Sequence, residues 1–267
     1  MPEPLAVASW NVNSLRVRLP QVLDYLRTNP VDVIGLQETK LTDDLFPRAD
    51  FEALGYHVAS CGQKTYNGVA LLSRQPLDAV CSELAGFDDP QRRVIAATSG
   101  GVRYLNVYVP NGQSVGSEKY RYKLRFLAAL RDHIEDELAR FPRLVVMGDF
   151  NIAPDDRDVH DPAAWTGQVL CSPPEREALG RLLGLGLADS FRLFDQPPAT
   201  FSWWDYRVAG FRRNLGLRID LLLASRALVP DCIAAGVHVE PRRNERPSDH
   251  APVYGHFAAA AAARAGS

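Results

Sequence analysis

Short runs of apolar and β-branched residues, bounded by turn-forming residues, recur along the chain and predict β-strands. The runs cover residues 5–10, 31–36, 68–72, 94–98, 104–109, 144–147, 219–224, 233–239 and 253–257. Other segments place their apolar residues at helical spacing, namely 17–28, 120–140 and 176–185. Several strands follow one another directly, so the pattern favours mixed sheets sandwiched by helices over a doubly wound nucleotide-binding fold.

Length and terminal composition set the expected domain limits. The chain has 267 residues, with 46% hydrophobic and 23% charged content, which are ordinary values for a globular α/β domain. We expect a single domain over residues 1–257, followed by an Ala-rich, disordered tail over residues 258–267. There is no Gly-rich phosphate loop and no repeat with a period of about 20–50 residues.

The apolar runs and cysteines indicate the cellular setting. No run approaches the roughly 20 apolar residues that span a bilayer, and the N-terminus lacks the features of a secretory signal. The cysteines are scattered without a Cys-x-x-Cys motif, so neither a disulfide framework nor a zinc site is expected. They are Cys61, Cys81, Cys171 and Cys232. A cytoplasmic location is the simplest expectation.

The charge balance does not by itself indicate a nucleic-acid-binding protein, because the net charge is −2 and the pI is near 6.3. The basic residues are nevertheless clustered. The clusters are Lys119, Arg121, Lys123 and Arg125; Arg207, Arg212, Arg213 and Arg218; and Arg242, Arg243 and Arg246. One such cluster is usually a solvated surface, whereas three in an acidic chain point mildly to a polyanionic partner.

The segment Pro247-Ser248-Asp249-His250-Ala251-Pro252 combines an acidic residue and a histidine between two prolines. The prolines restrict the backbone on both sides, so the pair is presented in a stiff loop before a predicted strand. An isolated Asp-His pair is more often an incidental surface turn than a catalytic site. Its interpretation therefore depends on polar residues elsewhere in the chain.

Other predicted strands also end in polar residues, among them Asn11, Glu38, Asp149 and Asn151. Each alone is explained by turn or cap formation. Asp220 is different, because it interrupts an otherwise apolar strand. Burying a carboxylate there costs several kcal/mol unless it is paired, and a histidine is a suitable partner.

These side chains together fit metal-assisted hydrolysis. Glu38, Asp249 and Asn11 offer hard oxygen ligands, which suit Mg²⁺ or Mn²⁺ better than zinc. Asp220 behind His250 would orient the imidazole and stabilise its protonated form. Asp149 and Asn151 can hold a water and a phosphate oxygen. The set fits in-line attack of water on a phosphodiester.

The chain resembles the exonuclease III class of apurinic/apyrimidinic endonucleases, within the endonuclease/exonuclease/phosphatase superfamily that includes DNase I. The resemblance covers residues 5–257 and is carried by residues 10–16, 34–40, 66–73, 91–93, 106–112, 148–154, 201–207, 216–220 and 247–252. Gly-Asp-x-Asn and Ser-Asp-His are widespread in the superfamily. Trp-x-Asp-Tyr-Arg and Gly-Leu-Arg-Ile-Asp are narrower, and they point to its DNA-repair branch.

The resemblance implies a four-layer α/β sandwich of two packed mixed sheets flanked by helices, with the site at one edge. It also implies a monomeric DNA-repair nuclease that uses Mg²⁺ or Mn²⁺. Such an enzyme cleaves double-stranded DNA 5′ to abasic sites and trims 3′ ends by 3′–5′ exonuclease activity. One alternative is a phosphatase acting on a small or lipid phosphoester. Another is a DNA-binding module with a dead site, which the full set of expected catalytic side chains disfavours.

The resemblance further assigns roles around the scissile phosphate. Glu38 would be the chief metal ligand, with Asn11 and Asp249 close by. Asp149 would activate or position the water, while His250 would bind a phosphate oxygen and be braced by Asp220. Whether Asp149 or His250 is the base stays open.

The remaining assignments concern substrate contacts. Asn151 would bind phosphate and orient Asp149, and Tyr108 would hydrogen-bond the scissile phosphate. Asn111 would also reach phosphate, although some relatives carry Gln at this position. Trp203 and Phe201 would line an apolar pocket for a flipped-out abasic sugar. The basic and aromatic segment 208–215, with Arg212 and Arg213, would contact DNA.

Overall fold

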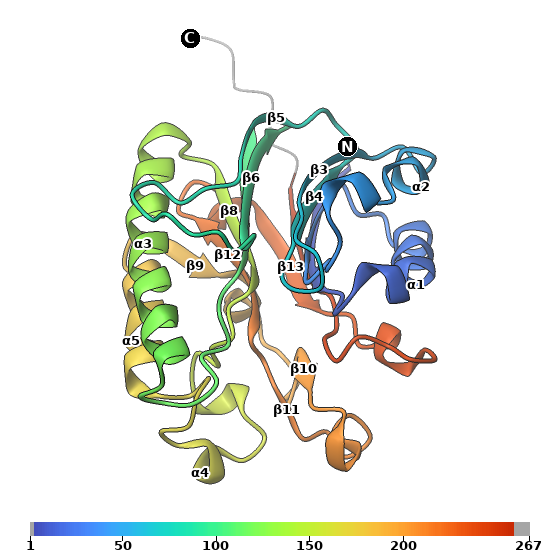
Figure 1. The fold of residues 1–267 in the computed structure, drawn as a ribbon. Coiled ribbons are helices and arrows are strands. Elements are labelled where there is room, and N and C mark those ends of the chain that lie inside the picture. The colour runs from blue at the N-terminus through green and yellow to red at the C-terminus, as the bar shows by residue number, and fades with distance from the viewer. Residues whose placement is uncertain (1–2, 259–267) are drawn as a thin grey trace.

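Two six-stranded β-sheets face each other, and helices cover their outer faces (Figure 1). The structure is a computed structural model that describes residues 3–258. The four layers run helix, sheet, sheet, helix, which confirms the predicted α/β sandwich. The predicted single domain over residues 1–257 stays a prediction. The predicted tail lies, apart from Ala258, outside the described residues.

Each sheet is mixed. The first has the order β13 (Cys232–Val237), β14 (Val253–Phe257), β1 (Leu5–Asn11), β2 (Val33–Gln37), β4 (Val69–Ser73), β3 (His57–Cys61). The second has the order β5 (Asp78–Cys81), β6 (Val94–Ser99), β7 (Val102–Tyr108), β8 (Leu144–Asp149), β12 (Asp220–Ser225), β9 (Leu187–Asp189). The pairs β1–β2 and β7–β8 are parallel, and the other neighbouring pairs are antiparallel. A short hairpin pairs β10 (Trp203–Trp204) with β11 (Gly216–Leu217).

The helices divide between the two outer faces (Figure 1). The elements are α1 (Leu15–Thr28) and α2 (Arg48–Glu52) on the first sheet, α3 (Glu118–Arg140) and α5 (Pro173–Leu183) on the second, and the short α4 (Pro162–Trp165) below them. Ser117 caps α3, since its hydroxyl accepts a hydrogen bond from the Tyr120 backbone N–H. Within residues 3–258, no helix has the length and apolarity needed to cross a bilayer.

Three apolar interfaces hold the layers together, and strand β8 shows why its sequence is a continuous apolar run. Leu144 and Val146 face the α3–α5 helices, whereas Val145 and Met147 face the opposite sheet. Successive side chains of a strand point to opposite faces, so a strand covered on both sides is apolar at every position. A third apolar cluster lies between the first sheet and α1.

All of the predicted strand and helix segments are present, with bounds that differ by a few residues. The prediction missed the strands β3, β5, β9, β10 and β11 and the short helices α2 and α4. Strand β5 carries mostly exposed side chains and β9 has three residues, so neither leaves a clear apolar pattern. Asp220, expected inside a strand, is instead the first residue of β12.

A buried amide pair joins the two sheets behind the polar strand ends. Asn106 on β7 accepts a hydrogen bond from Gln37 Nε2 at 2.6 Å. Its own Nδ2 donates to the carbonyl oxygens of Leu36 and Ala70, both at 2.9 Å. Gly35 makes room for this side chain, because a Cβ there would lie 2.8 Å from Asn106 Cγ. The amide pair therefore sets the spacing between β2 and β7.

The Asn106→Leu variant is expected to lower the free energy of unfolding by about 3 kcal/mol, because it leaves buried polar groups of the other sheet without partners. Urea unfolding of the variant and the parent measures the difference. Gln168→Leu, at an exposed amide, is the control and should change stability by less than about 0.5 kcal/mol. Equal effects of the two substitutions would contradict the inter-sheet role.

Candidate active site

The polar strand ends meet at one edge of the two sheets, where the β10–β11 hairpin also lies (Figure 1). Asp149 ends β8 and lies opposite Asp220 in the antiparallel ladder and opposite Tyr108 in the parallel one. In the other sheet, Asn11 ends β1 opposite Gln37, the residue before Glu38. Because the two sheets pack face to face, their polar ends form one cluster.

A buried relay connects His250 to Ser202. His250 Nδ1 lies 2.9 Å and 3.1 Å from the two carboxylate oxygens of Asp220. The Ser202 hydroxyl donates to Asp220 Oδ2 at 2.6 Å. All three residues are buried, so Asp220 has the partner that its position in an apolar segment requires. The imidazole Nε2 is left facing Asp149, with 3.8 Å between Nε2 and Asp149 Oδ2.

Asp149 is held by donors on both of its oxygens. The backbone N–H of Asn151 donates to Oδ1 at 2.8 Å. The side-chain amides of Asn11 and Asn151 donate to Oδ2 at 2.9 Å and 3.1 Å. Asn151 has a φ of 50°, a left-handed conformation that asparagine tolerates, and this turn brings both of its N–H groups to Asp149. The carboxylate is thereby held in one orientation.

Burial and charge shift both titratable groups of this pair. Burial raises the pKa of Asp149 above its ordinary value, and nearby His250 opposes that rise. Burial lowers the pKa of His250, but the negative charges of Asp220 and Asp149 outweigh it, so this pKa is raised above its ordinary value. Asp149 is therefore a better proton acceptor than a free carboxylate, and His250 favours the protonated form.

Glu38, Asp149 and His250 can hold a metal ion, because one ligand atom of each lies within 4.8 Å of the others. Glu38 also forms an ion pair with Lys40, with 2.9 Å between Nζ and Oε2. The other predicted ligands are placed differently. Asn11 directs its amide nitrogen at Glu38 and Asp149, while its oxygen accepts from the Asn13 backbone.

Asp249 lies beside this group and is not part of it. Its oxygens accept hydrogen bonds from Asn13 Nδ2 at 2.9 Å and from Trp203 Nε1 at 3.0 Å. As metal ligands, Asn11 and Asp249 stay predictions.

The predicted phosphate contacts cluster around Asp149. Asn111 Nδ2 donates to Asn151 Oδ1 at 3.1 Å, so these two amides are in direct contact. Tyr108 lies under the Arg93 guanidinium, 4.6 Å from the ring centre. Burial, together with the charges of Glu38 and Asp149, raises the pKa of Tyr108, which keeps it a hydroxyl donor.

The predicted sugar- and DNA-contacting residues separate into two groups. Trp203 is half-buried at the site, where it bonds Asp249. Phe201 is only 2% exposed and packs with Trp204 and Ala251 in an apolar cluster. The expectation that it lines a pocket is therefore corrected, since its ring belongs to the core. Arg212 and Arg213 are exposed on the segment between β10 and β11.

Several residues of this site were not predicted from the sequence. Lys40 follows Glu38 by two positions, and its Nζ also donates to Asn13 Oδ1 at 2.6 Å. Ser202 supports Asp220, and Arg93 covers Tyr108. All three lie within or beside the motif segments. Only their positions next to the predicted catalytic residues could have indicated them, because a single Ser, Lys or Arg forms no distinctive sequence pattern.

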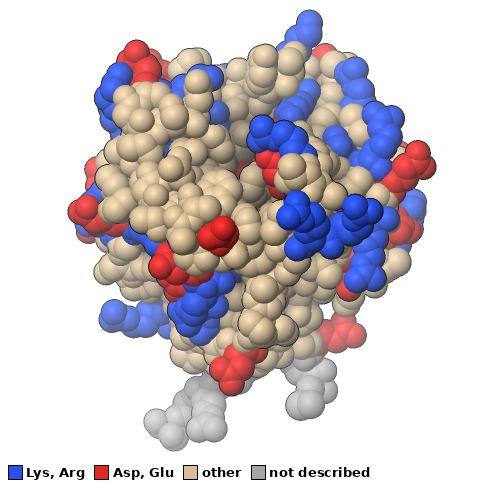
Figure 2. Space-filling view, turned by 90° about the horizontal axis from the view of Figure 1, so that it is seen from below, with Lys and Arg blue, Asp and Glu red and all other residues tan. Residues whose placement is uncertain are grey.

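The face that carries the strand ends is seen in Figure 2. It is hollowed near its middle, and Lys and Arg side chains gather along one side of it. This arrangement is favourable for an anionic ligand despite the net charge of −2.

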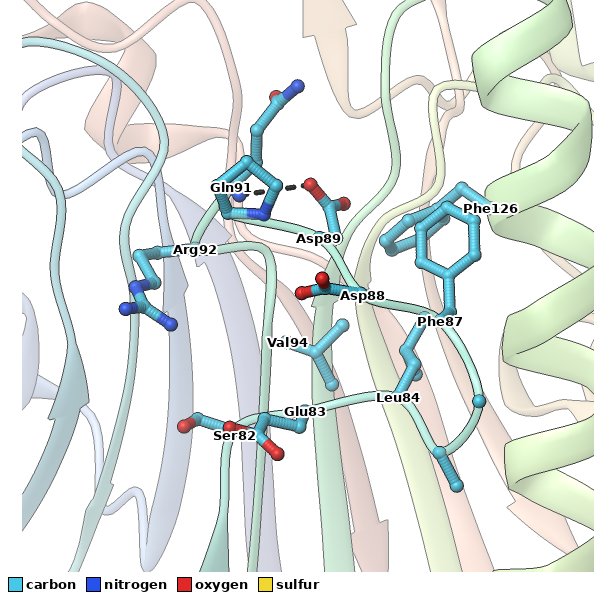
Figure 3. A pocket seen from close by; sticks show the side chains of 13 residues that line it. Ser82, Glu83, Leu84, Phe87, Asp88, Asp89, Gln91, Arg92, Val94 and Phe126 are labelled. Carbon is cyan, nitrogen blue, oxygen red and sulfur yellow. Dashed lines mark hydrogen bonds between the residues drawn. The ribbon is translucent and has the colours of Figure 1, made fainter.

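A separate cavity of about 690 Å³ lies between the segment of residues 82–94 and Phe126 of α3 (Figure 3). Asp88, Asp89 and Glu83 make its lining acidic. In Figure 3, Asp89 points to the Gln91 backbone N–H, which donates to it at 2.9 Å. None of the predicted site residues lines this cavity, so the catalytic cluster is a separate feature.

The fold and site have clear counterparts among known proteins. The sequence profile of the Endonuclease/Exonuclease/phosphatase family matches residues 8–250. Exodeoxyribonuclease III of Haemophilus influenzae is 40% identical over 266 residues, which cover 93% of this chain and 98% of that protein.

Two solved structures extend this likeness. A 3′ phosphatase from Neisseria, bound to a product DNA hairpin, is 49% identical with a TM-score of 0.93, over 95% of this chain and 99% of that one. An AP endonuclease from Archaeoglobus fulgidus is 37% identical with a TM-score of 0.91, over 95% and 99% of the two chains. The likeness therefore extends over nearly the whole of each protein.

Proposed function

The chain belongs to the endonuclease/exonuclease/phosphatase family, and we propose that it hydrolyses the phosphodiester 5′ to an abasic site in double-stranded DNA with Mg²⁺ or Mn²⁺. The family predicted from the motifs is confirmed, and the chain is a DNA-repair nuclease of that family. The observation that carries the proposal is the cluster at one sheet edge of half-buried Glu38 with buried Asp149 and the buried His250–Asp220 pair.

Asp149 is assigned as the general base. Its raised pKa suits proton transfer near neutral pH, and its two oxygens are oriented by Asn11 and Asn151. His250 is a poor base while protonated. With Asp220 behind it, His250 instead donates from Nε2 to a phosphate oxygen and stabilises the charge that develops on it.

Glu38 is assigned as the metal-binding residue with Asp149 beside it, and the two carboxylates supply the hard oxygen donors that Mg²⁺ favours. A bound divalent ion would supply charge neutralisation at the phosphate. Lys40 pairs with Glu38 in this structure, so the ammonium competes for the same carboxylate and keeps it oriented toward the cluster.

The Glu38→Gln variant is expected to weaken divalent-ion binding by about 100-fold, since the amide removes the exposed negative charge of the cluster. Isothermal titration of Mg²⁺ or Mn²⁺ into parent and variant measures this without turnover. Glu118→Gln, at an exposed glutamate of α3, is the matched control. Undiminished ion affinity in Glu38→Gln would refute the metal assignment.

DNA contacts are assigned to Arg212 and Arg213 on the exposed β10–β11 segment, with Asn111 on the phosphate and Trp203 against the abasic sugar. The two arginines supply backbone attraction that is independent of base sequence. The protein is proposed to act as a monomer.

One gel assay tests the main proposal. A duplex with a single abasic analogue is incubated with the protein, with and without Mg²⁺, beside a matched duplex with an intact base. We expect one metal-dependent cut on the 5′ side of the abasic position that leaves a 3′-hydroxyl. Cleavage of the intact duplex at the same rate would refute abasic specificity. Hydrolysis confined to inositol phosphates would favour the small-phosphoester alternative.

Processing of 3′ ends is the second activity of this site. The 49% identity to a 3′ phosphatase from Neisseria supports it, and so does the likeness to an exodeoxyribonuclease III. The rates at which the protein processes a 3′-recessed duplex and a 3′-phosphorylated duplex are measured in the same gel assay and compared with its rate of cleavage at the abasic site.

A further inference from the structure

Lys123 is a buried cation on α3, and its side chain is 0% exposed. Its Nζ donates to the carbonyl oxygen of Asn151 at 2.6 Å and to that of Asn111 at 3.1 Å. Its third acceptor is Glu175 Oε1 at 2.5 Å. An ammonium has three N–H donors, so all three are satisfied, and two of the three acceptors lie in the backbone of the active-site loops.

Glu175 joins the same ammonium to the start of α5. Its Oε1 accepts from the Leu170 backbone N–H at 3.1 Å, and its Oε2 accepts from the Ser172 N–H at 3.1 Å and from the Ser172 hydroxyl at 2.5 Å. Glu175 is also 0% exposed. Lys123 is therefore anchored from behind by an N-terminal cap that has its own fixed geometry.

The two carbonyl groups belong to the residues whose side chains meet beside Asp149. Asn111 donates to Asn151, and Asn151 donates to Asp149 from both its backbone and its side chain. The Asn151 carbonyl is turned toward α3, where Lys123 donates to it. One ammonium thus bridges two loops that approach the same carboxylate.

We infer that Lys123 is a positioning residue that ties the Asn111 and Asn151 loops together and so holds the amides that orient Asp149. This inference rests on the proposed function, because it concerns the same site. A buried ion pair is often no more stabilising than an apolar pair of similar volume. Lys123 also donates to two backbone carbonyls of the active-site loops, and an apolar pair could not make these hydrogen bonds.

The chain offers a matched control. Arg103 of β7 and Glu137 of α3 form another buried ion pair, with both side chains 3% exposed. Arg103 also donates to a backbone carbonyl, that of Ala79, at 2.7 Å. None of these residues contacts the catalytic cluster. Both pairs are buried ion pairs with one residue on α3. They differ in the backbone that the cation contacts, because Lys123 donates to the active-site loops and Arg103 donates to Ala79.

The test compares two double variants, Lys123→Met/Glu175→Met and Arg103→Met/Glu137→Met, on the abasic duplex. We expect kcat to fall about 100-fold in the first and less than about threefold in the second, with KM changed less than kcat in both, because a misplaced catalytic group costs turnover. Equal effects of the two double variants on kcat would overturn the inference.

A single variant guards against misfolding of the double variant. Lys123→Arg keeps the charge and the Glu175 ion pair, but its larger planar head group cannot occupy the ammonium position between the two carbonyls. We expect kcat to fall about tenfold at a temperature where the unfolding curve shows the variant to be fully folded. Parental kcat in this variant would also overturn the inference.

Amide hydrogen exchange gives a readout that needs no substrate. In Lys123→Met/Glu175→Met, exchange should become faster at residues 111–113 and 150–153, and these residues should be unaffected in the control. If exchange at residues 111–113 and 150–153 is the same in this variant as in the parent, the positioning role is overturned, even when kcat has fallen. If the parent fails to cut the abasic duplex, the proposed function fails, while the exchange experiment still decides the role of Lys123.

Discussion

The Asp149→Asn variant is expected to lose about 10³–10⁴-fold in kcat on the abasic duplex. An amide cannot accept the proton of the attacking water. It also presents N–H groups where Asp149 now accepts from Asn11 and Asn151, so one of those contacts becomes a donor–donor clash. Single-turnover rates in excess enzyme measure the chemical step separately from DNA release.

The affinity for DNA distinguishes loss of the general base in Asp149→Asn from a general loss of folding. Asp149→Asn should bind the abasic duplex at least as tightly as the parent, because it removes a negative charge near the phosphate. Asp132→Asn, at an exposed carboxylate of α3, should leave both rate and affinity unchanged. A single-turnover rate within about tenfold of the parent would exclude Asp149 as the base.

The Asp220→Asn variant is expected to lower kcat by about 10³-fold at pH 7, with a defect that grows as the pH rises. Burial alone lowers the pKa of His250, and the Asp220 and Asp149 charges reverse that shift. Removing the Asp220 charge lowers the pKa, so His250 loses its proton at a lower pH than in the parent. The variant-to-parent rate ratio should therefore recover as the pH falls.

Ser202→Ala is the matched control for this pair, because it removes the hydroxyl donor to the Asp220 carboxylate and the acceptor of the Ile219 and Asp220 backbone N–H groups, yet keeps the carboxylate charge. We expect about a tenfold loss with the parental pH dependence. A variant-to-parent ratio for Asp220→Asn that is flat between pH 6 and pH 9 would refute the charged role of His250.

The strand segments were predictable because their signal is local. Strands such as β8 are covered by helices on one side and by the other sheet on the opposite side, so their apolar runs stand out from the turns around them. The polar residues that interrupt or follow these runs were conspicuous for the same reason. Asp149, Asp220 and His250 were identified in this way.

Other parts of the site left no local signal. Lys123 falls among basic residues of an amphipathic helix, and only the packing of α3 against the Asn111 and Asn151 loops shows that it is buried. Phe201 shows the opposite difference, since this motif residue was expected to line a pocket and its ring packs in the core.

The sequence alone determined the class of fold, the family and most of the side chains that do the chemistry, because apolar runs and motifs are properties of neighbouring residues. Only the tertiary structure decided how those side chains are grouped. It joined His250 with Glu38 and Asp149, and it left Asp249 bonded to Asn13 and Trp203. The physical reason is that strand register and sheet packing set distances between residues far apart in the chain, and no local pattern records them.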